Sequence, residues 1–325
     1  MAEDYPKTLL EFQKRFSTEA ACRKYLIELR WPDAIECPKC GHKKAWGGSR
    51  GRFICAACDF QFTETSGTIL HGTRKPLMLW FNLIWHVTSQ KYGANAIGMQ
   101  RVLGLGSYHT AWEWLHKLRR GMIRPGREKL SGVVEVDETL IGGEKPGKRG
   151  RGAEGKELVL IAVEDKAEAG FGRIRLRHVA DASAESLTKF VEDCIKIGSH
   201  VRTDGWRGYN HLKKRGYDHI VKIQSSNVGD KVSLLLADRI AALLKRWLLG
   251  TYQGAMRPNH LEYYLDEYTF RFNRRASASR GKLFYRLIQQ IMMVDSVQHA
   301  DINGGYRLPQ PGDLYPDPLD PELEF

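Results

Sequence analysis

The chain contains no long hydrophobic run. No uninterrupted apolar stretch in its 325 residues approaches the roughly 18 residues that a membrane-spanning helix needs. Its first segment, residues 1–16, is charged and has no apolar core of the kind that a signal peptide requires. Internal repeats are absent as well. These absences argue against membrane, secreted and repeat proteins, and we expect a soluble, intracellular chain.

Cysteine is scarce outside one cluster. Of six cysteines, Cys22 and Cys194 stand alone, and the other four lie close together. A secreted protein held together by disulfides would have its cysteines paired throughout the chain. The clustering instead favours metal binding in a reducing compartment.

Acidic residues are fewer than basic ones. Lys and Arg total 50 against 38 Asp and Glu, which gives a formal net charge of +12. The corresponding pI is about 9.4. Such an excess favours an anionic partner, most commonly nucleic acid. A basic soluble enzyme without that partner is the alternative, because composition does not show whether the charge forms a patch.

The four clustered cysteines predict a structural zinc site. They form two CxxC pairs, Cys37/Cys40 and Cys55/Cys58. Each pair can place two thiolates on one tight turn, and two such turns complete a closed tetrahedral site. Cysteines without metal and a redox role are the alternatives, and two matched pairs argue against both. Basic side chains between the pairs favour contact with a phosphate backbone.

The remaining pattern predicts an α/β protein with several domains. Helical periodicity over 7–30 ends at Trp31-Pro32, since a residue before proline is forced out of the α region. Later strand-like runs are 133–143, 157–165, 173–181 and 200–205, and helical runs are 183–197, 231–250 and 258–270. The expected domains are a helical region (1–30), a zinc ribbon (31–70), a helix-turn-helix region (75–125), a strand-rich α/β domain (130–295) and a tail (300–325).

Residues 93–120 predict a helix-turn-helix, because two short helical patterns flank a glycine-containing turn at 103–106. Its expected core comprises Ile97, Val102, Leu105, Trp112, Leu115 and Leu118. Residues expected to face a DNA groove are Ser107, Tyr108, His109 and Glu113, and those expected near the backbone are Lys117, Arg119 and Arg120. An ordinary helical pair with a solvated basic end is the alternative.

Two aspartates are attached to predicted strands, Asp137 in VVEVDETLIGG and Asp204 in HVRTDGW. Phosphodiester cleavage by a hydroxyl nucleophile requires divalent ions beside the scissile phosphate. Carboxylates from neighbouring strands are suitable ligands for Mg²⁺ or Mn²⁺. Ordinary turn chemistry at the strand ends is the alternative for both residues.

A third acidic ligand is expected on the following helix. Asp238 is the only acid in the run 233–252 and follows Asp204 by 34 positions. Lys245 lies about two helical turns further along the same face. A surface salt bridge beside Arg239 is the alternative role for Asp238, and Glu262 is the reserve candidate for the third ligand.

Taken together, these segments resemble the ISXO2-like family of insertion-sequence transposases over roughly residues 8–290. The resemblance rests on ordered motifs: LRWPD, CPKCG, CAAC, RVLGL, TAWEWLHKLRR, VEVDETLIGG, KRGRGAEGK, TDGWRGY, LLKRWLLGTYQG and YYLDEYTFRFNRR.

The resemblance implies an N-terminal zinc ribbon, a helix-turn-helix and an RNase H-like catalytic core of the DDE type with Mg²⁺ or Mn²⁺. Carried over by position, its first two acids are Asp137 in VDET and Asp204 in TDGW. The third position, which varies among relatives, holds Asp238, and Lys245 also matches as an auxiliary residue. The asparagine that some relatives have upstream of this position is absent here.

The implied partner is double-stranded DNA, both at the terminal inverted repeats of a mobile element and at its target. Under this interpretation, further contacts to DNA come from Lys148, Arg149, Arg151, Arg271, Arg274 and Arg275. Synapsis of two element ends implies at least a homodimer on DNA, in a bacterial cytoplasm and on the nucleoid when bound. A non-catalytic DNA-binding regulator and a general zinc-ribbon nuclease are the alternatives.

Overall fold

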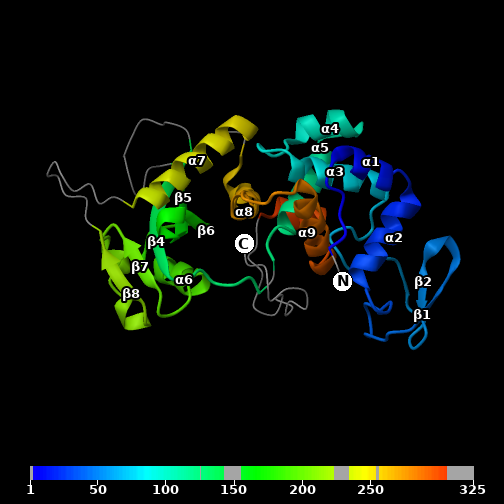
Figure 1. Cartoon of the computed structure of the whole chain (residues 1–325), viewed down its shortest axis with the longest axis horizontal. Helices are drawn as coiled ribbons and strands as arrows, with labels where there is room; N and C mark the ends of the chain where they lie inside the picture. The colour runs from blue at the N-terminus through cyan, green and yellow to red at the C-terminus, as the bar shows by residue number, and fades with distance from the viewer. Residues whose placement is uncertain (1–2, 125, 143–154, 223–233, 254–255, 306–325) are drawn as a thin grey trace. The chain divides into compact units, whose positions relative to one another are not determined.

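The chain forms two compact units in the computed structural model (Figure 1). Unit 1 comprises residues 1–125 and 276–325, and unit 2 comprises residues 126–275. The structure describes residues 3–124, 126–142, 155–222, 234–253 and 256–305. Within these residues, no helix combines the length and the apolar character needed to cross a membrane.

Unit 1 is helical apart from one small sheet. Its helices are α1 (Leu9–Arg15), α2 (Glu19–Arg30), α3 (Leu77–Ser89), α4 (Ala96–Leu103), α5 (Tyr108–Arg120), α9 (Arg280–Met293) and α10 (His299–Asn303). The predicted helical region 7–30 is two helices, because the Thr18 side chain accepts a hydrogen bond from the Ala21 N–H and starts α2. As predicted, α2 ends before Trp31-Pro32.

An aromatic core joins α1, α3 and α9. The ring of Phe284 lies 5.3 Å from that of Phe12, 5.6 Å from Phe16 and 5.8 Å from Phe81, as measured between centroids. Contacts of this kind stabilise a core beyond the area they bury. Because α9 completes this core, residues 276–295 belong to unit 1 in the structure, whereas the expected α/β domain extended to 295.

The helix-turn-helix segment forms as α4 and α5, which pack against each other. Gly104 adopts a left-handed conformation with φ of 61° and ends α4, a geometry that favours glycine. The predicted core is wrong at Ile97 and Val102, which are 52% and 58% exposed. Trp114 is buried instead and stacks on Trp80 with centroids 3.9 Å apart, so α5 turns this side inward.

Unit 2 contains a five-stranded mixed sheet. Its elements are β4 (Val133–Ile141), β5 (Glu157–Asp165), β6 (Phe171–Val179), α6 (Ala184–Cys194), β7 (His200–Thr203), β8 (Asp218–Val221), α7 (Leu235–Tyr252) and α8 (Leu261–Asn273). The strand order is β6-β5-β4-β7-β8. Pairing is antiparallel among the first three strands and parallel from β4 to β7 and β8. This topology is RNase H-like, as the family resemblance implied.

Helices cover both faces of this sheet. On one face, Val134 and Val136 of β4 share a core with residues of α6, including Leu187 and Phe190. On the other, apolar residues of β5 and β6 pack against α7 and α8. Since β4 is central and has a helix layer on each side, its residues alternate between two buried environments.

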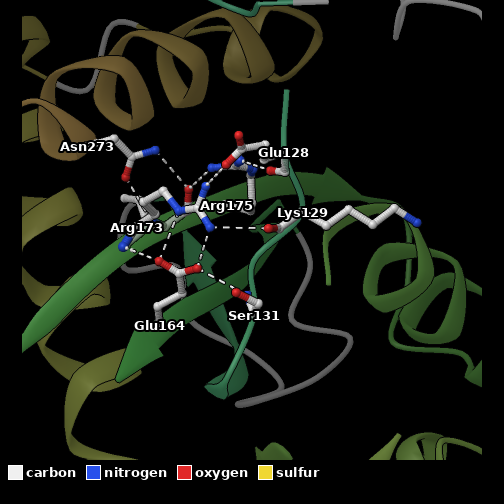
Figure 2. A network of polar contacts seen from close by, with 8 residues as sticks. Glu128, Lys129, Ser131, Glu164, Arg173, Arg175 and Asn273 are labelled. Carbon is white, nitrogen blue, oxygen red and sulfur yellow. Dashed lines mark hydrogen bonds and ion pairs between the residues drawn. The ribbon is translucent and has the colours of Figure 1, made fainter. Parts of the chain in front are cut away.

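A polar network fastens both ends of unit 2 to β6 (Figure 2). Arg173 pairs with Glu164 of β5 at 2.7 Å and with Glu128 at 3.0 Å. Asn273, at the end of α8, accepts a hydrogen bond from the Ile174 N–H at 2.7 Å. The segment that enters the sheet and the helix that leaves it are therefore held by the same strand.

Candidate active site and metal centres

Asp137 and Asp204 lie at the same end of neighbouring strands. β4 and β7 are parallel in a register that pairs Glu135 with Arg202, so two residues further along stand Asp137 and Asp204. β7 ends at Thr203, one residue before Asp204. Beyond that point β4 has no paired strand on its β7 side among the described residues. Carboxylate oxygens of Asp137, Glu138 and Asp204 all lie within 4.8 Å of one another.

The electrostatics of this acidic cluster suit a divalent cation. The pKa of Asp137 is raised to about 7, first by burial and then by the negative charges of Glu138, Asp204 and Asp238, against a hydrogen bond from the Glu138 N–H. Oxygens around one Mg²⁺ lie about 3–4 Å apart, since each bond measures about 2.0–2.1 Å. Small side-chain adjustments would therefore fit the cluster around an ion.

Glu138 is the member of the cluster that the sequence analysis missed. Tyr209, in the helical turn Arg207–Tyr209, donates a hydrogen bond from its hydroxyl to Glu138 Oε2 at 3.1 Å. Burial and the Glu138 charge raise the pKa of Tyr209 well above its usual value, which keeps the phenol protonated. The signal in the sequence is only an acid directly after Asp137.

Asp238 lies in the first turn of α7 and is exposed. Glu135, two residues before Asp137, accepts hydrogen bonds from the N–H groups of Leu236 at 2.9 Å and Ala237 at 3.2 Å. These N–H groups have no partner within the helix, so Glu135 ties the start of α7 to β4. Asp238 is close enough to raise the pKa of Asp137 but lies outside the carboxylate cluster found in the described residues.

The two other candidates near α7 lie elsewhere. Lys245 is exposed on α7. Glu262 of α8 is buried and accepts a hydrogen bond from the His178 N–H in β6 at 2.6 Å. Burial, followed by the charge of Asp266, raises its pKa to about 8. Glu262 is thus engaged at the β6 edge and is not among the clustered carboxylates that the structure describes.

The four cysteines converge as the spacing predicted. They lie on a three-stranded antiparallel sheet of β1 (Ala45–Gly47), β2 (Phe53–Cys55) and β3 (Gln61–Phe62) and the turns beside it. Sγ atoms are 3.8 Å apart for Cys37 and Cys58 and 3.6 Å for Cys40 and Cys55. Four sulfurs at about 2.3 Å from one zinc would lie about 3.8 Å apart, so the cluster fits a tetrahedral site.

The predicted groove-facing residues of α5 are accessible in part. Tyr108 is 43% exposed and His109 is also exposed. The Ser107 hydroxyl accepts a hydrogen bond from the His109 N–H at 3.1 Å and so caps the start of α5. Glu113 pairs with Lys117 at 2.8 Å and with His299 at 3.3 Å.

Among the backbone-contacting candidates of α5, Arg119 requires a correction. It is only 2% exposed and lies beside His116, with 3.3 Å between Nη1 and Nδ1. Because Arg119 points toward the same side as the buried Leu115 and Leu118, its guanidinium is not presented to DNA. Arg120 is half-buried.

The cations at the end of α8 make contacts within unit 2. Arg271 pairs with the buried Glu267 at 2.9 Å. Arg274 lies over the ring of Phe270 at 4.2 Å, and Arg275 over that of Phe272 at 4.3 Å. These contacts lie within unit 2, and the expected role of the three arginines at DNA phosphates stays a prediction. Lys148, Arg149 and Arg151 lie outside the described residues.

Comparison with known proteins agrees with this geometry. Residues 129–273 match the ISXO2-like transposase domain, and residues 17–61 match the transposase zinc-ribbon domain. An uncharacterized protein in transposable element ISH50 of Halobacterium salinarum is 25% identical over 258 residues, covering 72% of this chain and 85% of that protein.

Among solved structures, one similar chain comes from a cryo-EM structure of the simian T-cell lymphotropic virus intasome in complex with PP2A regulatory subunit B56 gamma. It is 12% identical, with a TM-score of 0.32, and the match covers 62% of this chain and 74% of that chain. The family matches cover the acidic cluster and all four clustered cysteines. Residues 129–273 therefore form an ISXO2-like transposase domain, which makes the chain a DDE-type enzyme, and a transposase zinc ribbon precedes that domain.

Proposed function

We propose that this transposase binds the terminal inverted repeats of its insertion sequence and catalyses metal-dependent DNA cleavage and strand transfer. The convergence of Asp137 and Asp204 at the open end of the β4–β7 pair carries the proposal. The chemistry of strand cleavage requires little from the protein beyond holding ions and DNA in place. The central position of β4 in the sheet supports such a role for Asp137.

Asp137, Asp204 and Asp238 are the proposed ligands of the catalytic Mg²⁺ or Mn²⁺. When bound, such ions activate the attacking hydroxyl and stabilise the leaving oxygen. Asp137 and Asp204 hold the site from the sheet, and Asp238 approaches from α7, whose start is tied to β4 by Glu135. Lys245, on the same helix, is proposed as an auxiliary contact to the DNA phosphate.

Zinc at the four cysteines is proposed to have a structural role. A closed set of four thiolates leaves no coordination position for a substrate. The ribbon is small, with a core that includes Phe62 beside Cys37 and Cys55, and such a core needs the metal for stability.

Recognition of DNA is proposed to involve the N-terminal end of α5, where Tyr108 and His109 are exposed. The net charge of +12 favours binding to the phosphate backbone. Joining two element ends requires the two to be held together, so we propose at least a dimer on DNA, acting on the bacterial chromosome in the cytoplasm.

The test is cleavage of a duplex carrying the element's terminal repeat, with Mg²⁺ or Mn²⁺, by the intact protein and by Asp137→Asn and Asp204→Asn. We expect each variant to bind the duplex normally and to lose more than about 100-fold in cleavage, since outer-shell partners of a metal alone contribute about 10- to 100-fold. Full cleavage by both variants would overturn the proposal. Binding without cleavage by the intact protein would indicate a regulator, and equal cleavage of unrelated duplexes a general nuclease.

A further inference from the structure

Two consecutive acids of β4 contribute to one cluster, although strand geometry should separate them. Side chains of neighbouring strand residues point to opposite faces of a sheet. Asp137 lies on the α7 side with Glu135, whereas Glu138 reaches toward Tyr209, a member of the α6-side core. Their carboxylate oxygens nevertheless lie within 4.8 Å of each other and of Asp204. They meet because β7 has ended and no strand separates them at this edge.

Tyr209 is held rigidly beneath Glu138. Its side chain is fully buried, and its hydroxyl donates to Glu138 Oε2 at 3.1 Å. The preceding Gly208 allows this packing, because a Cβ at that position would lie 2.5 Å from the Leu187 Cδ1 atom of α6. The phenol is therefore held by its burial in the α6-side core and by its hydrogen bond to Glu138.

We propose that Glu138 is an additional ligand of the catalytic divalent cation and that Tyr209 is its positioning residue. The inference rests on the proposed function, since it adds a ligand to the same site. An ionised carboxylate has about four lone-pair sites, so accepting one hydrogen bond from Tyr209 leaves capacity for a metal bond. Hydrogen bonds to ligating carboxylates are the usual means of orienting them. The arrangement gives the ion ligands from both faces of β4.

The test measures binding of Mn²⁺ to the full-length, zinc-loaded protein by electron paramagnetic resonance, in the absence of DNA. In Glu138→Gln, the amide oxygen can still accept from Tyr209, so the fold is kept while the charge is lost. We expect its Mn²⁺ affinity to fall by about 10-fold or more, a loss at least as large as that for an outer-shell partner. Glu168→Gln, an exposed acid in the turn Ala167–Ala169, is the matched control and should bind Mn²⁺ normally.

Tyr209→Phe separates positioning from ligation. It keeps the buried ring and removes only the hydroxyl, and we expect a loss of Mn²⁺ affinity of about 10-fold with thermal unfolding close to that of the intact protein. Unchanged affinity in Glu138→Gln, together with a loss in Asp204→Asn, would overturn this inference and leave the proposed function standing. Unchanged affinity in both would overturn the two together.

Discussion

At the scale of single residues, three acids of β4 occupy different environments within four positions. Glu135 accepts hydrogen bonds from the start of α7, Asp137 lies in the acidic cluster, and Glu138 is bound by Tyr209. Of these three, Asp137 has the most negative surroundings, because Glu138, Asp204 and Asp238 all raise its pKa. The stability of the unliganded enzyme should therefore depend on the protonation of this strand.

The first prediction concerns pH. The pKa of Asp137 rises from 3.8 to about 7 on folding, so the folded state binds this proton more tightly than the unfolded state does. The stability that protonation contributes is complete below about pH 4 and is lost as the pH rises through about 7. Mg²⁺ competes with the proton, so its stabilising effect should grow over the same range.

Thermal unfolding with and without Mg²⁺ between pH 5 and 8.5 measures this effect. Asp137→Asn is the control, because its side chain does not titrate, and its Mg²⁺-dependent shift should be small at every pH. A shift in the intact protein that is independent of pH would contradict the assignment.

The sequence was sufficient to predict the two aspartates and insufficient for their neighbour. Asp137 and Asp204 follow from strand-like runs whose ends meet at one sheet edge. Glu138 could not be predicted, because the alternation of side chains along a strand places it on the opposite face of the sheet from Asp137. Its carboxylate reaches Asp137 and Asp204 only because β7 ends before this point. Arg119 was assigned to DNA because charge in a sequence does not show which side of a helix is buried.

At the scale of elements, the start of α7 connects the sheet to Asp238, the proposed third acid. Glu135 is buried, with 6% of its surface exposed, and its carboxylate lies 4.0 Å from the Arg202 guanidinium. Burial raises the pKa of Glu135, although the Ala237 and Leu236 N–H groups oppose this. Its main structural effect is to satisfy two helix N–H groups that would otherwise be buried without a partner.

The second prediction is that Glu135→Ala loosens the first turn of α7. We expect a loss of about 0.5–2 kcal/mol in unfolding free energy, as for removal of an N-cap, and a reduced cleavage rate with unchanged DNA affinity. Hydrogen exchange should show faster exchange at Leu236 and Ala237. Glu135→Gln keeps a hydrogen-bond acceptor and should retain most of the protection at these two amides. If they exchange as slowly in Glu135→Ala as in the intact protein, Glu135 does not hold the start of α7.

The third prediction concerns the ribbon. Removal of zinc with a chelator, or Cys55→Ser, should unfold residues 37–62, because the ribbon's core is built around its cysteines. The strands β4, β5 and β6 have their own core and should keep their hydrogen-exchange protection. Loss of protection in both regions would show that the two units fold as one, and an unaffected ribbon would exclude a structural metal.

The long elements were predictable because their patterns are periodic, and short ones were not. Strands β4, β5 and β6 begin or end within two residues of the predicted runs. β8 is a four-residue edge strand, DHIV, in which only His219 is buried, and so short a strand has no periodic pattern to recognise. Ile97 and Val102 look like core positions by residue type, and only the tertiary packing of α4 exposes them.

At the scale of the whole molecule, the network on β6 secures the borders of unit 2 (Figure 2). Glu164 is 1% exposed in its side chain and receives a 2.7 Å ion pair from Arg173. Burial would raise the pKa of Glu164, but the hydrogen bonds from Arg173 and from the Ser131 N–H lower it. The ion pair and the surrounding backbone contacts therefore depend on each other.

The fourth prediction is that Arg173→Leu destabilises the protein by about 3–5 kcal/mol, because it leaves the Glu164 charge buried without its partner. Urea unfolding followed by circular dichroism measures the change. Arg173→Leu with Glu164→Leu removes both charges and should recover most of the loss. A double variant as unstable as the single one would show that the backbone contacts, not the charge, dominate.

The network also has a topological consequence. Glu128, Lys129 and Asn273 contact the same short stretch of β6: Arg175 donates to the Glu128 carbonyl, Arg173 to the Lys129 carbonyl and the Ile174 N–H to Asn273. Arg275 also donates to the Gly172 carbonyl of this stretch. Unit 2 is thus a domain inserted into the sequence of unit 1, and its first and last residues lie close together. Domains with neighbouring ends tolerate insertion and circular permutation. Joining residue 275 to residue 126 with a short glycine linker, and opening the exposed turn at Ala167–Ala169, should yield a circular permutant that folds by itself.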